Sequence, residues 1–308
     1  MTIYDIFKKA VALGIKNDFR PQDEALDYYW REIIEGKKGE KFINPYADTG
    51  VVWTADLKKE IKIVVLQIDL DINEIIAIRE KYKKEKILFL VHHPQGRPDA
   101  TFPHILKIQL GNLKSQGVNT SGLVKYFDKI VEELVNETLG SNPDRLPKIL
   151  RLLNCDCLAI HTPIDNLAAR YMERNILKSG ARNLKDCLNF LLSIPEYSFL
   201  SRFYDLTPKI FSGRPENKLG KVLLTEFTGG EEGPVEIFKA MKRSGVDTII
   251  VMHMSAKAIE TAKKLKLNVI CAGDIGSDSI GLNLFCDLLE KENIKIIAGS
   301  GFTRVIRN

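Results

Sequence analysis

The chain has 308 residues, 44% of them hydrophobic and 28% charged, and its 45 Lys and Arg against 40 Asp and Glu leave a formal net charge of +5. This composition supports a full hydrophobic core and excludes disordered and collagen-like chains. The mixed charge lacks the concentrated basic stripe of a nucleic-acid-binding protein, so nucleic acid is not expected as a partner. Lys and Glu are abundant and Gln is scarce, a thermophile-like bias.

The N-terminal segment and the cysteines predict a cytoplasmic protein. Residues 1–19 are amphipathic with lysines in their middle, unlike the uninterrupted apolar core of a signal peptide. No run approaches the roughly 18 apolar residues of a membrane span, so no membrane association is expected. The five cysteines are odd in number and lie in apolar contexts, which favours buried free thiols in a reducing compartment.

Short apolar runs predict strands, and apolar residues at three- and four-residue spacing predict helices. In chain order we expect strands at 61–70 and 87–91 with a helix near 75–84 between them, a helix at 121–139, a strand at 155–160, a helix at 166–178, and strands at 222–226, 247–252, 268–271 and 294–298. Continuous apolar strands separated by helices predict an α/β fold whose sheets are covered on both faces.

The lobe organisation is predicted from two further segments. Residues 234–271 read as helix, strand, helix, strand, with Pro at the start and Gly at the end of the first helix. The stretch 205–220 is rich in Pro, Gly and polar residues, as boundaries between lobes often are. We therefore expect a single domain of two lobes, an N-terminal one of 1–204 with a helical insertion and a C-terminal one of 221–308.

Four of the five histidines lie at or beside the ends of predicted strands, namely His92, His93, His161 and His253. The loops beyond the carboxyl ends of parallel strands bind ligands, so these side chains can converge in space. Consecutive residues after a strand point in opposite directions, which suits His92 and His93 as ligands of two different ions. The alternative is a pair of polar residues at a strand end. The fifth, His104, is expected to have a structural or surface role.

Three aspartates accompany these histidines. His161 and Asp165 are four residues apart at a strand-to-helix turn, where Asp165 either caps the helix or ligates a metal. Asp274 and Asp278 are also four apart, close to a helix expected from about Ser279, where they are either ligands or acids that cap the helix and interact with its dipole. His and Asp on three such loops are the ligand types of first-row divalent metals, and this conjunction favours a metal site.

The motifs resemble one family when taken together. VHHP at 91–94, HTPID at 161–165 and AGDIGSDSIGL at 272–282 are similar to the NGG-one-interacting-factor-three-like (Nif-three-like) family of dinuclear metal proteins, also called GTP cyclohydrolase type 2 homologues. The resemblance runs from 46–53 to the C-terminus and includes 226–247, but 1–45 and 110–150 do not match. It implies two similar α/β lobes facing one another across a metal cleft, and a homo-oligomer, commonly a toroidal hexamer.

The resemblance also implies a ligand set. His92 and His93 would each bind one of two ions, and Asp165 would join His93 on one of them. Where the family has a histidine and, four residues on, a bridging glutamate, this chain has Asp274 and Asp278. With both aspartates as ligands the site is rich in oxygen, which shifts its preference from zinc towards iron, manganese or magnesium.

A two-ion site is the arrangement of many hydrolases. His161 or His253 would be the proton shuttle, because imidazole titrates near neutral pH. We expect a metal-dependent hydrolase acting on a small phosphate- or nucleobase-bearing molecule, although no P-loop or nucleophile elbow identifies the substrate. The alternative is a non-catalytic binding or regulatory protein in which the metals hold the two lobes together.

Overall fold

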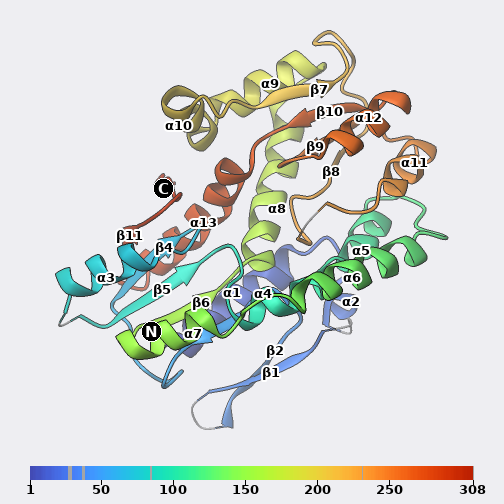
Figure 1. The fold of residues 1–308 in the computed structure, drawn as a ribbon. Coiled ribbons are helices and arrows are strands. Elements are labelled where there is room, and N and C mark those ends of the chain that lie inside the picture. The colour runs from blue at the N-terminus through green and yellow to red at the C-terminus, as the bar shows by residue number, and fades with distance from the viewer. Residues whose placement is uncertain (27–29, 37–38, 84, 231, 308) are drawn as a thin grey trace.

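The computed structural model describes residues 1–308 apart from 27–29, 37–38, 84, 231 and 308 (Figure 1). Its strands form a five-stranded, a four-stranded and a two-stranded sheet. The strands are β1 Glu32–Glu35, β2 Lys41–Asn44, β3 Gly50–Trp53, β4 Ile63–Gln67, β5 Ile87–Val91, β6 Asp156–Ala159, β7 Lys209–Ser212, β8 Val222–Leu224, β9 Thr248–Val251, β10 Asn268–Cys271 and β11 Lys295–Ala298.

The helices make up most of the remaining ordered structure. They are α1 Ile3–Asn17, α2 Gln22–Leu26, α3 Ile72–Lys81, α4 Arg97–Thr101, the 3-10 turn η2 Phe102–Ile105, α5 Ile108–Ser115, α6 Val124–Thr138, α7 Arg145–Leu153, α8 Thr162–Ser179, α9 Leu184–Ser193, α10 Pro195–Tyr204, α11 Glu236–Arg243, α12 Ala256–Lys264 and α13 Asp274–Glu290. The predicted α/β class is therefore confirmed.

The two larger sheets share one design. The five-stranded sheet has the order β11-β4-β5-β6-β3, in which only β3 is antiparallel to its neighbour. The four-stranded sheet has the order β7-β10-β9-β8, in which only β7 is antiparallel. Each is thus a parallel sheet with one antiparallel edge strand, and the parallel strands deliver their carboxyl ends to one edge, where ligands bind.

All seven predicted strands are present, and the strands that the sequence patterns missed are β1, β2, β3 and β7. These four are short and partly exposed, so they lack the continuous apolar run that marks the buried strands. The sheets also divide the chain differently from the predicted lobes. β7 precedes residue 221 yet joins the four-stranded sheet, and β11 pairs with β4 in the five-stranded sheet.

Helices α8 and α13 begin earlier than predicted, which changes the position of three aspartates relative to the helix starts. Pro163 occupies the first turn of α8, where its missing N–H costs nothing, so this helix begins at Thr162. Gly273, with φ of 97°, ends the extended chain after β10 and α13 begins at once. Asp165, Asp274 and Asp278 are therefore inside helices, which excludes the alternative in which Asp165 or Asp278 caps its helix.

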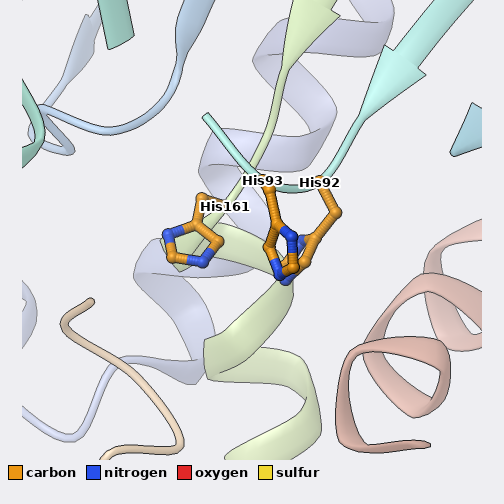
Figure 2. A group of neighbouring side chains, drawn as sticks. All are labelled: His92, His93 and His161. Carbon is orange, nitrogen blue, oxygen red and sulfur yellow. The ribbon is translucent and has the colours of Figure 1, made fainter. Parts of the chain in front are cut away.

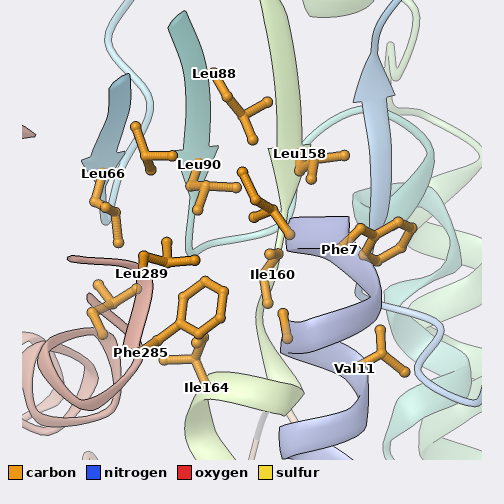
Figure 3. Close-up of a cluster of buried hydrophobic side chains, with 14 of the residues drawn as sticks. Phe7, Val11, Leu66, Leu88, Leu90, Leu158, Ile160, Ile164, Phe285 and Leu289 are labelled. Carbon is orange, nitrogen blue, oxygen red and sulfur yellow. The ribbon is translucent and has the colours of Figure 1, made fainter. Parts of the chain in front are cut away.

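The main core lies between the five-stranded sheet and three helices (Figure 3). Leu66, Leu88, Leu90 and Leu158 of the strands face Phe7 and Val11 of α1, Ile164 of α8, and Phe285 and Leu289 of α13. A second apolar cluster with residues of α3 and α7 covers the other face, as the continuous apolar strands predicted. Helix α8 runs between the two larger sheets, with α13 beside it (Figure 1).

The remaining sequence-based expectations concern cysteines and membranes. All five cysteines are free, and Cys155, Cys157, Cys187 and Cys286 are buried, as predicted. Within the described residues, none of the helices is both long enough and apolar enough to cross a membrane.

Gly281→Ala is expected to destabilise the protein and to disturb the spacing of α8 and α13. A Cβ at Gly281 would lie 2.4 Å from the carbonyl oxygen of Ile164, a backbone atom that cannot turn aside. Overpacking of this kind costs about 1–3 kcal/mol of unfolding free energy. Thermal and denaturant unfolding measure it. Gly140→Ala is the control, because its Cβ meets only the Glu137 oxygen at 3.5 Å; equal stability losses would contradict the close approach.

Candidate metal centre

Three histidine rings gather at the carboxyl ends of β5 and β6 (Figure 2). The ring centroid of His92 lies 5.4 Å from that of His93 and 4.8 Å from that of His161. Each Nδ1 faces an acceptor: the Ile160 carbonyl for His92 at 3.1 Å, Asp69 Oδ1 for His93 at 2.7 Å and Asp48 Oδ2 for His161 at 2.9 Å. Because an acceptor fixes the proton on Nδ1, the neutral form of each ring presents an Nε2 lone pair to the shared centre, as metal-binding histidines do.

The carboxylates arrive from two helices. Asp165 lies in the first turn of α8, and Asp274 and Asp278, four residues apart, share one face of α13. His92 Nε2 is 3.2 Å from an Asp165 oxygen and 3.3 Å from Asp278 Oδ1, while His93 Nε2 is 3.5 Å from Asp278 Oδ2 and 3.8 Å from Asp274. The one carboxylate of Asp278 thus faces both histidines, one oxygen to each.

These residues fit divalent ions. When the rings are neutral and carry their proton on Nδ1, the buried atoms His92 Nε2, Asp165 Oδ1 and Asp278 Oδ2 have no hydrogen-bond partner. Such groups normally cost free energy unless a proton or a metal ion satisfies them. Two ligand atoms that are each about 2.0–2.3 Å from one ion lie about 3–3.5 Å apart at ordinary coordination angles. The spacings around Asp278 match that separation.

Three overlapping groups have ligand atoms that all lie within 4.8 Å of one another, namely His92–Asp165–Asp278, His93–Asp274–Asp278 and His92–His93–His161. The first two groups describe two neighbouring positions joined by Asp278. The convergence of these side chains was expected from the sequence, but one detail differs: Asp165 groups with His92, whereas the resemblance placed it with His93. The reason is that Asp165, one turn into α8, faces the buried His92 ring.

The charges of the centre shift the pKa values of its members in opposite directions. Burial by itself lowers the pKa of His93, but hydrogen bonding and charge from Asp278 and Asp69 outweigh it, and the pKa rises to about 9. Burial raises the pKa of Asp278, but the charges and hydrogen bonds of His92 and His93 hold it well below its ordinary value. Without a metal, protons on the histidines therefore balance the carboxylates.

A cavity of about 270 Å³ opens beside the centre and is lined by His93, His161, Asp165, Asp274 and Asp278 on one side. His253 also lines this cavity. The pKa of Asp274 is raised to about 6, because burial and the charge of Asp278 outweigh the lowering effect of His253, His93 and His92. His253 belongs to none of the three ligand groups. His104 lies elsewhere, with its ring stacked at 6.1 Å on Trp30, in keeping with the structural role expected for it.

Sequence reasoning missed the acids behind the histidines and two acids of the cavity, Asp99 and Glu226. Asp69 follows the carboxyl end of β4, so the strand-end rule that selected the histidines could have found it. Asp48 lies in a loop before β3 with no pattern of its own, although its carboxylate is fully buried. Glu226, just after β8, also lines the cavity. The strand-end rule could have found Glu226 as well, whereas Asp48 carries no such signal in the sequence.

Asp48→Asn is expected to lower the pKa of His161 while the fold persists. Burial lowers this pKa, but the charge of Asp165 and the hydrogen bond to Asp48 outweigh it, so it lies above 6.5. A raised histidine pKa contributes stability that is complete below pH 6.5 and is lost as pH rises through the folded pKa. The metal-free variant should therefore lose stability mainly at acidic pH, as measured by thermal unfolding and NMR titration. The His104 resonance is the internal control; an unchanged His161 pKa would contradict the pairing.

Solved structures of other proteins share this architecture. No family profile and no curated protein sequence matches the chain. Its structure is similar to that of a NIF3 superfamily protein from Sphaerobacter thermophilus, with a TM-score of 0.74, 21% identity, and coverage of 96% of this chain and 98% of that one. Reduced HcgD from Methanocaldococcus jannaschii matches with a TM-score of 0.47, 16% identity and coverage of 81% and 88%. TTHA1606 from Thermus thermophilus matches with a TM-score of 0.47, 14% identity, and coverage of 97% of this chain and 97% of that one.

The first of these matches establishes the fold. It confirms at that level the resemblance noted in the sequence motifs. Because it covers 96% of the chain, it includes most of 1–45 and of 110–150, which the motifs left unassigned.

Proposed function

Starting from the fold of NIF3 superfamily proteins, we propose that this protein binds two divalent metal ions and is a metal-dependent hydrolase of a small molecule. One observation carries the proposal: the buried carboxylate of Asp278 faces His92 and His93 with separate oxygens beside an open cavity. Structural metal sites are closed by protein ligands, whereas catalytic sites keep space for water and substrate. The cavity of about 270 Å³ favours the catalytic kind.

Two histidines at this cavity, His161 and His253, are the candidates for proton transfer. Two adjacent divalent ions, when bound, lower the pKa of water and polarise the bond under attack. Asp48 holds His161 through Nδ1, so Nε2 is left to accept a proton at the cavity wall. His253 is placed to return a proton to the leaving group, since it lines the same cavity near Asp274. The aspartates favour iron, manganese or magnesium over zinc.

A non-catalytic role is the second candidate, and one observation favours it. The candidate ligands come from β5, α8 and α13, elements that are distant in sequence and surround the main core. Metal binding would therefore hold these elements together, as structural ions do. In that case removal of the ions would lower the stability of the protein and no substrate would be turned over.

Metal analysis and a hydrolysis screen separate the two candidates. Protein purified without chelator or affinity metal is expected to contain about two equivalents of iron, manganese or another divalent ion. Phosphoesters, nucleotides and cyclic amides are then screened with manganese present. His93→Ala should abolish hydrolysis and reduce the metal content, whereas His104→Ala, outside the centre, should change neither. Metal-containing protein that hydrolyses none of these classes and unfolds earlier after chelation supports the structural role.

We also propose a cytoplasmic homo-oligomer, and a hexamer in particular. The end of α10 and the segment that follows expose four large apolar side chains, Phe199, Phe203, Tyr204 and Leu206, with exposed fractions of 37–63%. Exposed apolar groups of this kind, gathered on one element, are typical of contact surfaces. Light scattering is expected to give a particle of about six chains, and Phe203→Glu should reduce its mass. A monomeric wild type would contradict the proposal.

A further inference from the structure

The cavity beside the metal centre is acidic beyond what metal binding requires. Among its described lining residues, five bear carboxylates and none is Lys or Arg. Asp165, Asp274 and Asp278 belong to the candidate ligand groups, but Asp99 and Glu226 do not. With two divalent ions bound, the three ligand carboxylates offset most of the metal charge, and Asp99 and Glu226 add two further carboxylates to the wall. A phosphate or carboxylate group would meet repulsion there, whereas a cation would be attracted.

Glu226 is the more deeply placed of the two extra acids. It follows β8 of the four-stranded sheet, and only 3% of its surface is exposed. Its backbone has φ of 62°, in the left-handed region that side chains other than Gly, Asn and Asp rarely adopt. Backbones held in such regions cluster at binding and catalytic sites, where the surrounding structure fixes them. The turn after β8 thus fixes a carboxylate at the cavity wall.

One part of the wall is apolar and suits a flat ring. Phe102 and Met252 line the cavity together with Gly230, whose φ of 80° fits the turn that brings the backbone there. An aromatic and a thioether side chain favour contact with the face or edge of a planar ring. The cavity therefore combines an apolar surface for a ring, a buried carboxylate, and the metal ligands.

We propose that Glu226 determines substrate specificity by binding a positively charged nitrogen on a planar substrate, such as an amidinium or a protonated heterocycle. This rests on the proposed function, in which the metal ligands act on the bond that is cleaved. A carboxylate in a cavity of low dielectric forms a short, charge-assisted and often bidentate hydrogen bond with such a group. Of the two substrate types expected from the sequence, the nucleobase-like one fits and the phosphate-bearing one does not.

Benzamidine, benzamide and inorganic phosphate test this recognition, because the first two match in shape and differ in charge. Their binding to the metal-loaded protein is measured by isothermal titration calorimetry. Wild-type protein should bind benzamidine at least about tenfold more tightly than benzamide, a difference that reflects one charge-assisted hydrogen bond. Both compounds should bind more tightly than phosphate. Glu226→Gln should make benzamidine and benzamide equivalent without changing the metal content.

Glu232→Gln is the matched control. Glu232 is a nearby acid in the same loop, but it accepts hydrogen bonds from the backbone N–H of Ser255 at 2.6 Å and from its hydroxyl at 2.7 Å, and it does not line the cavity. This variant should keep the preference for benzamidine. Retention of the preference in Glu226→Gln, or its loss in both variants, would overturn the assignment.

If Glu226→Gln fails to fold, ligand binding by the wild-type protein still tests the proposal. Equal binding of benzamidine and benzamide, or tighter binding of phosphate than of benzamidine, would contradict a cation-selective cavity. Absence of bound metal in a protein that still selects benzamidine through Glu226 would refute the metal-dependent function alone. Bound metal without charge selection would refute the specificity proposal alone.

Discussion

Asp278→Ala is expected to abolish binding of both proposed metal ions. Its two oxygens face His92 and His93 separately, so a single truncation takes one ligand from each position and leaves the buried His92 ring without that counter-charge. Loss of an outer partner of a metal ligand already costs about 10–100-fold in affinity, and loss of a shared ligand should cost more at both positions. Elemental analysis and metal titration of the purified variant measure the effect.

Asp287→Ala is the control on the same helix. Asp287 forms an ion pair with Arg304 at 2.6 Å, distant in sequence from the centre by more than two turns of α13. This variant should lose stability and keep two ions. A variant of Asp278 that keeps two equivalents with unchanged affinity would show that this carboxylate does not bridge, and loss of only one ion would assign it to a single position.

Metal affinity is expected to rise about 50-fold between pH 7 and pH 9, because His93 is about 1% deprotonated at pH 7 and about half deprotonated at pH 9. The pKa of His93 is about 9 in the metal-free protein, so at pH 7 an incoming ion must displace a proton from this ring. Each pH unit below that pKa weakens apparent binding about tenfold for one such proton. Calorimetric titrations in buffers of different ionisation enthalpy measure the affinity and the protons released together.

The same pKa predicts the pH dependence of the metal-free protein. Because the folded pKa of His93 is raised above 6.5, its contribution to stability is complete below pH 6.5 and is lost as pH rises towards and through 9. Chelated protein should therefore unfold at lower temperature at pH 9.5 than at pH 6.5, and added metal should reverse this difference. Metal affinity that does not change between pH 7 and pH 9 would contradict a protonated His93.

Much of the centre could be predicted because its residues follow strand ends. His92, His93 and His161 each come directly after a buried apolar strand, and parallel strands bring their carboxyl ends to one edge whatever the loops contain. Asp274 and Asp278 are separated by four residues, which places both on one face once the segment is helical. The seven strands and the α/β class followed from apolar runs alone.

The parts that escaped prediction depend on long-range packing. Asp48 is 113 residues from His161, and their contact arises only when β3 pairs with β6. The early start of α13 was hidden by its small residues, which are typical of a loop. Gly276 fits there because a Cβ would lie 2.5 Å from the ring of Tyr197, a contact that only the fold reveals. The position of β11 could not be inferred because its sequence fits either sheet.

Helix α13 follows β10 of the four-stranded sheet and precedes β11 of the five-stranded sheet, so it connects the two sheets. Its first turns carry Asp274 and Asp278, whereas His92 and His93 are fixed to β5. A rotation of the four-stranded sheet that moves the start of α13 would therefore change the distance between Asp278 and the two histidines. If the proposed ions bind, their occupancy and the angle between the sheets are thermodynamically linked, and each influences the other by the same free energy.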